Sequence, residues 1–146
     1  MYTKTFEQLT KDELYALLTL RQQVFVIEQQ SIYLDLDNLD QQAIHYLDFD
    51  EKGELHCYAR YRQTEIANEV KIERVVLSKH YRGLGKGKQL INTMLADILQ
   101  ANPNARTKLS SQVDASEFYQ KLGFFEFGEV YDDGGIMHVD MVYQGD

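Results

Sequence analysis

Apolar positions early in the chain repeat with the period of a helix. Thr10 and Glu13 form a capping box, in which the side chain of each residue can bond the backbone N–H of the other. We expect a helix from about Lys11 to Val26 behind this cap, because helical spacing relates Leu14, Leu17, Leu18, Arg21 and Phe25. The acidic stretch from Ser31 to Gln42 lacks such a period and is expected to be irregular.

The pattern then changes to short β-branched and apolar runs, which indicate strands. The turn at 50–54 contains Gly53 and charged residues, which suits a hairpin, and 132–135 suits a closing hairpin. The expected strands are 43–49, 55–62, 70–78, 107–113, 124–131 and 136–143.

A second helix is expected from Gly85 to the residues before Pro103, and a short one from Asp114 to Leu122. The helix that starts at Gly85 has a continuous apolar stripe, which consists of Leu90, Ile91, Met94, Leu95, Ile98 and Leu99. The order helix, strands, helix, strand, helix, strands predicts a single α/β or α+β domain over 1–146. Its mixed central β-sheet would be flanked by helices.

Charge and composition narrow the class of partner. The net charge of -8 argues against non-specific nucleic-acid binding and fits a cationic or amine-bearing partner better. Cys57 is the only cysteine, so no intrachain disulfide can form and a reducing compartment is expected. We find neither an apolar leader segment nor an apolar run of membrane-spanning length, so a cytoplasmic protein without a membrane partner is predicted.

A glycine-rich turn connects the strand expected at 70–78 to the second helix. It reads Arg82-Gly83-Leu84-Gly85-Lys86-Gly87 and is followed by Lys88. Glycines let the backbone approach a ligand closely, and the N–H groups and dipole at a helix start favour phosphate. The basic residues of this turn would add local positive charge to an acidic chain. The segment therefore predicts a phosphate-binding site.

Three other interpretations of the turn compete with one another. A dinucleotide-binding turn requires G-x-G-x-x-G, whereas the spacing here is G-x-G-x-G. A P-loop requires Gly-Lys-Ser/Thr after a longer gap, and Gly-Lys-Gly-Lys lacks the hydroxyl residue. A plain surface loop is disfavoured because each glycine weakens the start of the following helix.

A second motif, Ser-Glu-Phe-Tyr-Gln-Lys-Leu-Gly-Phe at 116–124, follows the turn along the chain. Together the two motifs resemble the GCN5-related N-acetyltransferases, the GNAT family. Arg82, Gly85 and Gly87 match its Arg/Gln-x-x-Gly-x-Gly/Ala signature, and 116–124 is similar to its late Phe-Tyr-x-x-x-Gly-Phe helix. The stretches 20–29, 128–132 and 135–141 resemble the ElaA-like subgroup. This resemblance covers nearly the whole chain and implies splayed strands that hold acetyl-CoA.

The resemblance also implies contacts to acetyl-CoA. The end of the strand before the turn would pair with pantetheine, and the turn would bind the pyrophosphate. Gln112 stands where the family often has an Asn that contacts the pantetheine arm. The implied cofactor-binding residues are Val75, Val76, Leu77, Arg82, Gly83, Leu84, Gly85, Lys86, Gly87, Lys88, Gln112 and Tyr119.

Acyl transfer to nitrogen requires an unprotonated amine and a proton for the leaving thiolate. The resemblance places Tyr119 as the proton donor, and the alternative for it is a core aromatic residue. Glu73 is a candidate base that acts directly or through water, or is only a carboxylate on the sheet surface. Since neighbouring strand residues face opposite sides, we expect one of Glu73 and Arg74 to face the acceptor.

Three further residues are candidates for contact with the acceptor. His45 and His138, on expected strands, could relay a proton, and a hydrogen-bonded structural role is the alternative for each. Glu28 could bind an ammonium group or be a surface charge at a helix end.

The acidic residues Asp35, Asp37 and Asp40 raise the question of a calcium site. An EF-hand loop counted from Asp35 would require Gly and Glu where Asp40 and Tyr46 stand, so the match fails. We expect an acidic lip of the acceptor cleft or a solvated loop instead. No zinc-ligand spacing is present, so no metal is predicted.

These observations predict an acetyl-CoA-dependent N-acetyltransferase that acts directly on a primary amine of a small molecule or peptide. No motif marks Cys57 as an acyl carrier. A non-catalytic acyl-CoA-binding domain and a structural or protein-interaction domain are the alternatives. Exposed strand edges at the closing hairpin would permit a homodimer.

Overall fold

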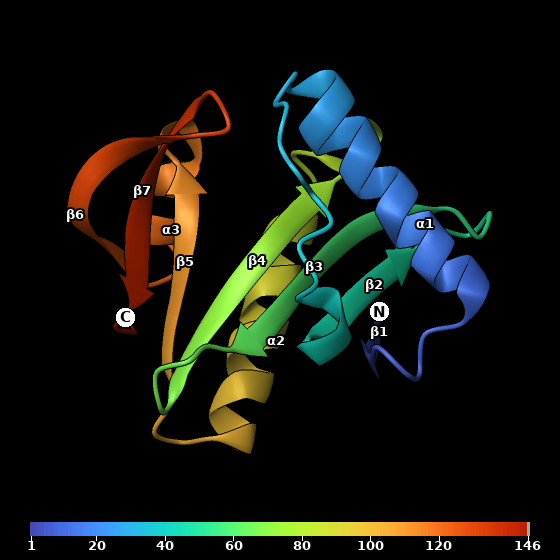
Figure 1. Cartoon of the computed structure of the whole chain (residues 1–146). Helices are drawn as coiled ribbons and strands as arrows, with labels where there is room; N and C mark the ends of the chain where they lie inside the picture. Colours follow the sequence, from blue (N-terminus) through green and yellow to red (C-terminus); the bar gives the residue numbers. More distant parts are fainter. Residues whose placement is uncertain (146) are drawn as a thin grey trace.

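A seven-stranded mixed sheet forms the centre of the molecule. The computed structural model describes residues 1–145, and within them the strand order is β1-β2-β3-β4-β5-β7-β6 (Figure 1). Among the strands of these residues, only β4 and β5 pair in parallel. The strands are β1 (Tyr2–Thr5), β2 (Ile44–Phe49), β3 (Leu55–Gln63), β4 (Glu69–Leu77), β5 (Arg106–Gln112), β6 (Phe124–Asp133) and β7 (Ile136–Tyr143).

Helices cover both faces of this sheet, as Figure 1 shows. The apolar stripe of α2 packs with residues of α3 into the larger core cluster. The α1 helix packs on the opposite face, where Leu17 and Leu20 meet Leu47, Tyr58 and Val76. The helical elements are α1 (Lys11–Arg21), η1 (Gln22–Glu28), η2 (Asp40–Gln42), η3 (Lys79–Tyr81), α2 (Lys86–Ala101), η4 (Val113–Ala115) and α3 (Ser116–Gln120).

The predicted α/β (α+β) architecture with a mixed sheet is confirmed. The Thr10–Glu13 capping box is present in both directions. The first helix differs from expectation: its α-helical part ends at Arg21, and 22–28 continue as a π-helix. The four-residue β1 was not predicted, because an edge strand this short carries too little periodicity. The β6 strand is the opposite edge of the sheet, and the homodimer through this hairpin stays a prediction.

The central parallel strands separate halfway along their length. β4 and β5 pair from Glu69 with Arg106 to Ile72 with Leu109, and no pairs follow. A register shift between β3 and β4 lies at this point, and Arg74 has a positive φ of 58°. Such a bulge bends a strand and increases its twist. Figure 1 shows β4 and β5 diverging from there, and residues of both strands beyond their last pair line a common cleft.

A network of arginines and aspartates fastens residues 31–42, which we call the acidic loop, to the sheet. Arg21 and Arg60 are fully buried. Arg21 Nη1 and Arg60 Nη1 lie 2.8 Å and 2.6 Å from the same Asp40 oxygen. Arg60 Nη2 lies 2.6 Å from Asp37, and Arg21 Nε lies 2.9 Å from Asp35. The expectation of an acidic lip or a solvated loop is therefore wrong, because these carboxylates face inward and neutralise buried guanidinium groups.

Candidate active site

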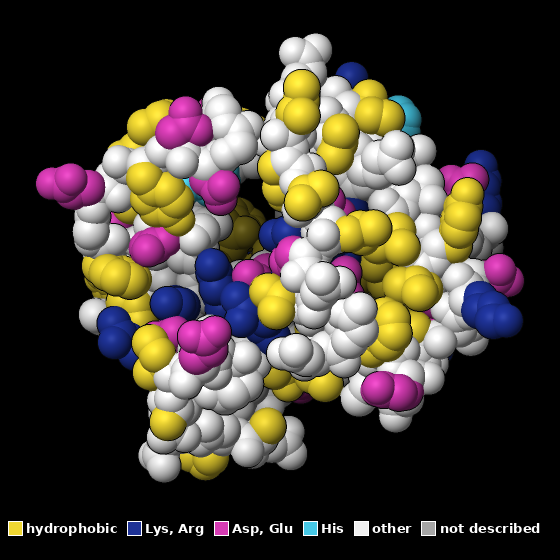
Figure 2. Space-filling model, in the orientation of Figure 1, with side chains coloured by type: hydrophobic (Ala, Val, Ile, Leu, Met, Phe, Trp, Pro, Cys, Tyr) yellow, Lys and Arg dark blue, Asp and Glu magenta, His cyan; other side chains and the backbone are white. Residues whose placement is uncertain are grey.

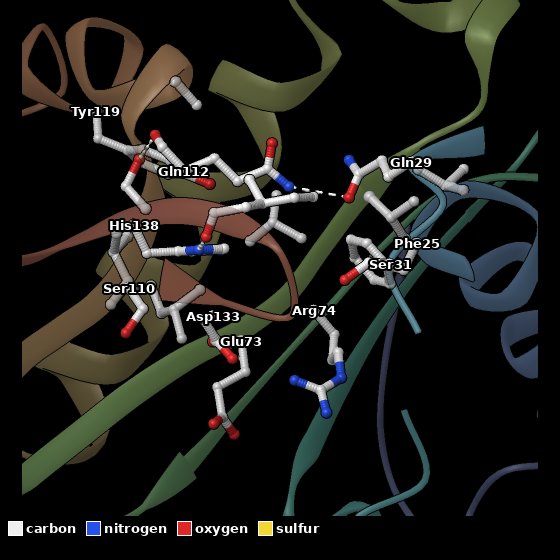
Figure 3. A pocket seen from close by; sticks show the side chains of 18 of the residues that line it. Phe25, Gln29, Ser31, Glu73, Arg74, Ser110, Gln112, Tyr119, Asp133 and His138 are labelled. Carbon is white, nitrogen blue, oxygen red and sulfur yellow. Dashed lines mark hydrogen bonds between the residues drawn. The ribbon is translucent and has the colours of Figure 1, made fainter. Parts of the chain in front are cut away.

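The separation of β4 and β5 produces a cleft of about 550 Å³. Its walls come from both halves of the sheet, from the π-helix η1 and from the start of the acidic loop. Figure 3 shows Tyr119, Gln112 and His138 facing Phe25, Gln29 and Ser31 across it, and Figure 2 shows the hollow on the surface. Two hydrogen bonds bridge the cleft: Gln112 Nε2 donates to Gln29 Oε1 at 2.9 Å, and Ser31 Oγ to the Gly134 carbonyl at 2.5 Å.

The glycine turn lies where β4 ends and α2 begins. Gly85, the N-cap of α2, has a positive φ of 79° and no side-chain cap. In the described chain no backbone acceptor bonds the N–H groups of Gly83, Leu84 or Gly85, and those of 86–88 form the first turn of α2, where helices lack internal partners. A Cβ on Gly87 would lie 3.3 Å from Phe118 Cζ, so this glycine lets α2 and α3 approach closely. The turn thus presents a row of free N–H groups suited to an anion.

Arg82 is held at the base of this turn. Its Nε and Nη2 donate to the Leu77 carbonyl at 3.1 Å and 3.0 Å. Its Nη1 lies 2.8 Å from Glu28 Oε2. Glu28 therefore pairs with the glycine turn in the structure, whereas the sequence suggested a contact with the acceptor. The cause is the π-helix, which carries Glu28 to the end of β4.

The residues expected to contact pantetheine line the cleft. Val75, Val76 and Leu77 form the end of β4 beyond its last pair with β5. Gln112, at the end of β5, also lines it, and its side-chain amide donates a hydrogen bond to Gln29.

Tyr119 reaches the cleft from α3. The residue is 8% exposed, and its ring packs edge-on against Phe118 and Phe124. Burial raises the pKa of its phenol, so the group stays protonated at neutral pH. Among residues 1–145 its hydroxyl has no hydrogen-bond partner. The geometry leaves a neutral O–H available to a group bound in the cleft.

Glu73 and Arg74 both line the cleft, although alternation predicted that only one would. The bulge at Arg74 breaks the alternation. Burial alone would raise the pKa of Glu73, but the hydrogen bond from Arg62 at 2.7 Å and the charge of Arg60 lower it overall. A carboxylate with a lowered pKa is a poor base, so direct proton abstraction by Glu73 is disfavoured. Arg74 Nε lies 2.9 Å from Asp35, so its charge is also paired.

The two candidate histidines have different surroundings. His45 is fully buried, with Nδ1 2.6 Å from the Tyr58 hydroxyl and Nε2 2.8 Å from the Asp40 carbonyl. It is not among the residues that line the cleft, and both ring nitrogens are already hydrogen-bonded, which favours the structural alternative for it. His138 does line the cleft, and its Nδ1 lies 2.7 Å from the Ile136 carbonyl.

Several residues of the cleft were not predicted from the sequence. They are contributed by the π-helix, the acidic loop and the β6–β7 hairpin, whose positions depend on contacts between distant segments. They include Phe25, Gln29, Ser31, Tyr33 and Asp133. Only the hairpin turn itself was recognisable, and its register places Asp133 opposite Ile136.

Within residues 1–145, no three His, Cys, Asp or Glu side chains gather as a metal site would require. No helix of the described chain combines the length and apolar character needed to cross a membrane.

Comparisons with known proteins agree with this geometry. The family model described as "Acetyltransferase (GNAT) domain" matches residues 7–144. UPF0039 protein sll0451 of Synechocystis sp. (strain PCC 6803) is 36% identical over 95% of this chain and 91% of its own. The crystal structure of Escherichia coli ElaA superposes with a TM-score of 0.91 at 34% identity, covering 98% of this chain and 97% of that one. That of a Pseudomonas aeruginosa acyl-CoA N-acyltransferase gives 0.90 at 34% identity, covering 97% of each chain. The chain therefore belongs to the GNAT acyltransferase family, as an ElaA-like member.

Proposed function

We propose that this protein transfers an acetyl group from acetyl-CoA directly to a primary amine of a small molecule or peptide. One observation carries the proposal: the cleft reaches Arg82, where the turn with free backbone N–H groups begins, and the neutral Tyr119 lines its wall. An anionic cofactor with a thioester at the far end of a flexible arm matches that arrangement. Membership of an acyltransferase family supports it.

In this proposal the N–H groups from Gly83 to Lys88 bind the pyrophosphate. Lys86 and Lys88 add positive charge, and Arg82 holds the end of β4 in place. The edge of β4 formed by Val75, Val76 and Leu77 would pair with the amides of pantetheine, because β4 pairs with β3 there but has no partner on the side of β5. Gln112 would contact the same arm after releasing Gln29.

Tyr119 serves as the general acid. Attack of the amine on the thioester carbonyl breaks the C–S bond, and the departing thiolate takes the phenolic proton. Because burial disfavours the phenolate, Tyr119 is reprotonated by a proton that the nitrogen loses as the amide forms.

The state of the single cysteine supports transfer without an acyl-cysteine intermediate. Cys57 is fully buried in β3, and burial, with Asp48 nearby, raises the pKa of its thiol to about 12. The thiolate is the nucleophile in cysteine chemistry, so Cys57 is inert at neutral pH.

The test is release of CoA thiol from acetyl-, propionyl- and succinyl-CoA with a panel of amines. Acetyl-CoA with at least one primary amine should give release well above the rate without amine. Binding of acetyl-CoA by calorimetry without release with any amine would favour a non-catalytic acyl-CoA-binding domain. Absence of binding would contradict both functions. The cytoplasmic location remains a prediction from the single cysteine.

A further inference from the structure

The charges that line the cleft are nearly all neutralised by one another or by their neighbours. Glu73 is bonded by Arg60 and Arg62, Arg74 is paired with Asp35, and Glu28 with Arg82. Lys71 lies 3.8 Å from Glu73. Among the described residues, Asp133 is the lining carboxylate with neither a hydrogen bond nor an ion pair.

Asp133 lies at the end of β6, opposite Ile136 in the closing hairpin. Figure 3 labels it with His138 and Glu73 among the residues that line the cleft. The hairpin is tied to the opposite wall by the bond between Ser31 and the Gly134 carbonyl. The side chain of Asp133 is exposed and lines the cleft, so its unpaired carboxylate is free to attract a cation that enters there.

The ring of His138 is oriented by a local contact. Its Nδ1 lies 2.7 Å from the Ile136 carbonyl, which can only accept, so Nδ1 carries the proton of the neutral ring. Nε2 then has a free lone pair, and no described residue bonds it. Tyr131 stacks on the ring, with centroids 6.2 Å apart, and the titratable groups that line the same cleft include Asp133, Tyr119 and Glu73.

We propose that the acceptor is a primary ammonium compound without a carboxylate on the adjacent carbon, that Asp133 binds its charge, and that His138 is the general base. This rests on the proposed function. A carboxylate beside the nitrogen would lie next to Asp133 and be repelled, whereas Phe25, Tyr33 and Ile136 offer apolar surface to a carbon chain.

The proton balance is complete with these groups. The ammonium gives one proton to His138 Nε2 and becomes a neutral amine, which attacks the thioester carbonyl. The C–N bond forms, the C–S bond breaks, and Tyr119 protonates the sulfur. The second proton lost by the nitrogen restores Tyr119, and the proton on His138 passes to solvent.

The experiment measures CoA release with matched pairs whose members have a single amine, tyramine against tyrosine and 3-methylbutylamine against leucine. Wild type should prefer the member of each pair without the carboxylate. Asp133→Asn should lower kcat/KM for the amines about tenfold or more and reduce the preference. His138→Gln should lower kcat about 100-fold or more while calorimetry shows unchanged acetyl-CoA binding, which also establishes that the variant is folded. Imidazole should restore part of the rate to His138→Ala.

His80→Gln is the matched control, because His80 is an exposed histidine outside the cleft. It should behave as wild type. Turnover in His138→Gln within threefold of wild type, or an unchanged pair preference in Asp133→Asn, would overturn the assignment of that residue and leave the proposed function standing. Wild type that releases no CoA with any amine would overturn both together.

Discussion

Arg82 and Glu28 form an ion pair, with Nη1 and Oε2 2.8 Å apart, that connects the glycine turn to the end of the π-helix. The two side chains are 41% and 40% exposed, so the pair contributes little to stability. Its importance is positional: an anion at the turn would lie beside an arginine whose other nitrogens already hold the last carbonyl of β4.

Arg82→Ala should weaken acetyl-CoA binding about tenfold, because it removes a positive charge and frees the Leu77 carbonyl. Glu28→Gln should leave binding equal or tighter, since it removes a negative charge beside the site. Calorimetry with acetyl-CoA measures both. An increase in the KM for the amine alone in Glu28→Gln would instead support the acceptor role first considered for Glu28.

Gly85→Ala should also weaken acetyl-CoA binding. The residue has a φ of 79°, a conformation that costs an L-residue about 1–2 kcal/mol, and relief of this strain would turn the N–H groups away. Gly128→Ala is the control, since Gly128 has the same φ of 79° and, like Gly85, open space around it. Both variants should lose similar stability to urea, and only Gly85→Ala should lose cofactor affinity. Equal affinities would exclude the turn as the binding site.

Tyr119→Phe should lower kcat about 100-fold, with the dissociation constant of acetyl-CoA unchanged, because only the proton donor is removed. Phe118→Leu, on the same short helix, provides a comparison in which packing changes and the hydroxyl stays. The measurement is steady-state CoA release together with calorimetry. Undiminished turnover in Tyr119→Phe would exclude it as the general acid.

Asp37 should make the free energy of unfolding depend on pH in the acidic range. Partial burial opposes ionisation of Asp37, but the hydrogen bond and charge of Arg60 outweigh it and lower the pKa to about 2. Since the unfolded chain has a higher pKa, near 4, this carboxylate stabilises the fold above about pH 4 and stops doing so as pH falls toward 2.

Asp37→Asn should therefore be less stable than wild type by on the order of 2 kcal/mol at pH 7, and the difference should shrink as the pH falls from 4 to 2. Urea denaturation across this range measures it. The exposed Asp114→Asn should match wild type throughout. A pH-independent difference for Asp37→Asn would show that packing, not charge, accounts for its effect.

The features predicted from the sequence were those encoded within a few neighbouring residues. The Thr10–Glu13 cap and the glycine turn depend only on local spacing, so the sequence alone predicts both. The role of Asp40 cannot be predicted in this way, because its partners Arg21 and Arg60 are about twenty residues away in sequence. Likewise, nothing in the spacing of His45 and His138 distinguishes a buried ring from one that faces a cleft.

The gap between β4 and β5 divides the sheet into two parts, which we call wings: β1 to β4, and β5 to β7. Only four residue pairs between β4 and β5 join the two wings within the described chain. Tyr119, Asp133 and His138 belong to one wing, and the end of β4 with the base of the turn belongs to the other. In the proposed binding mode, acetyl-CoA inserts into the gap and bonds the backbone of β4 where β5 no longer does. Loading the donor would then set the spacing of the wings, so the alignment of the reacting groups would be adjusted by the substrate itself.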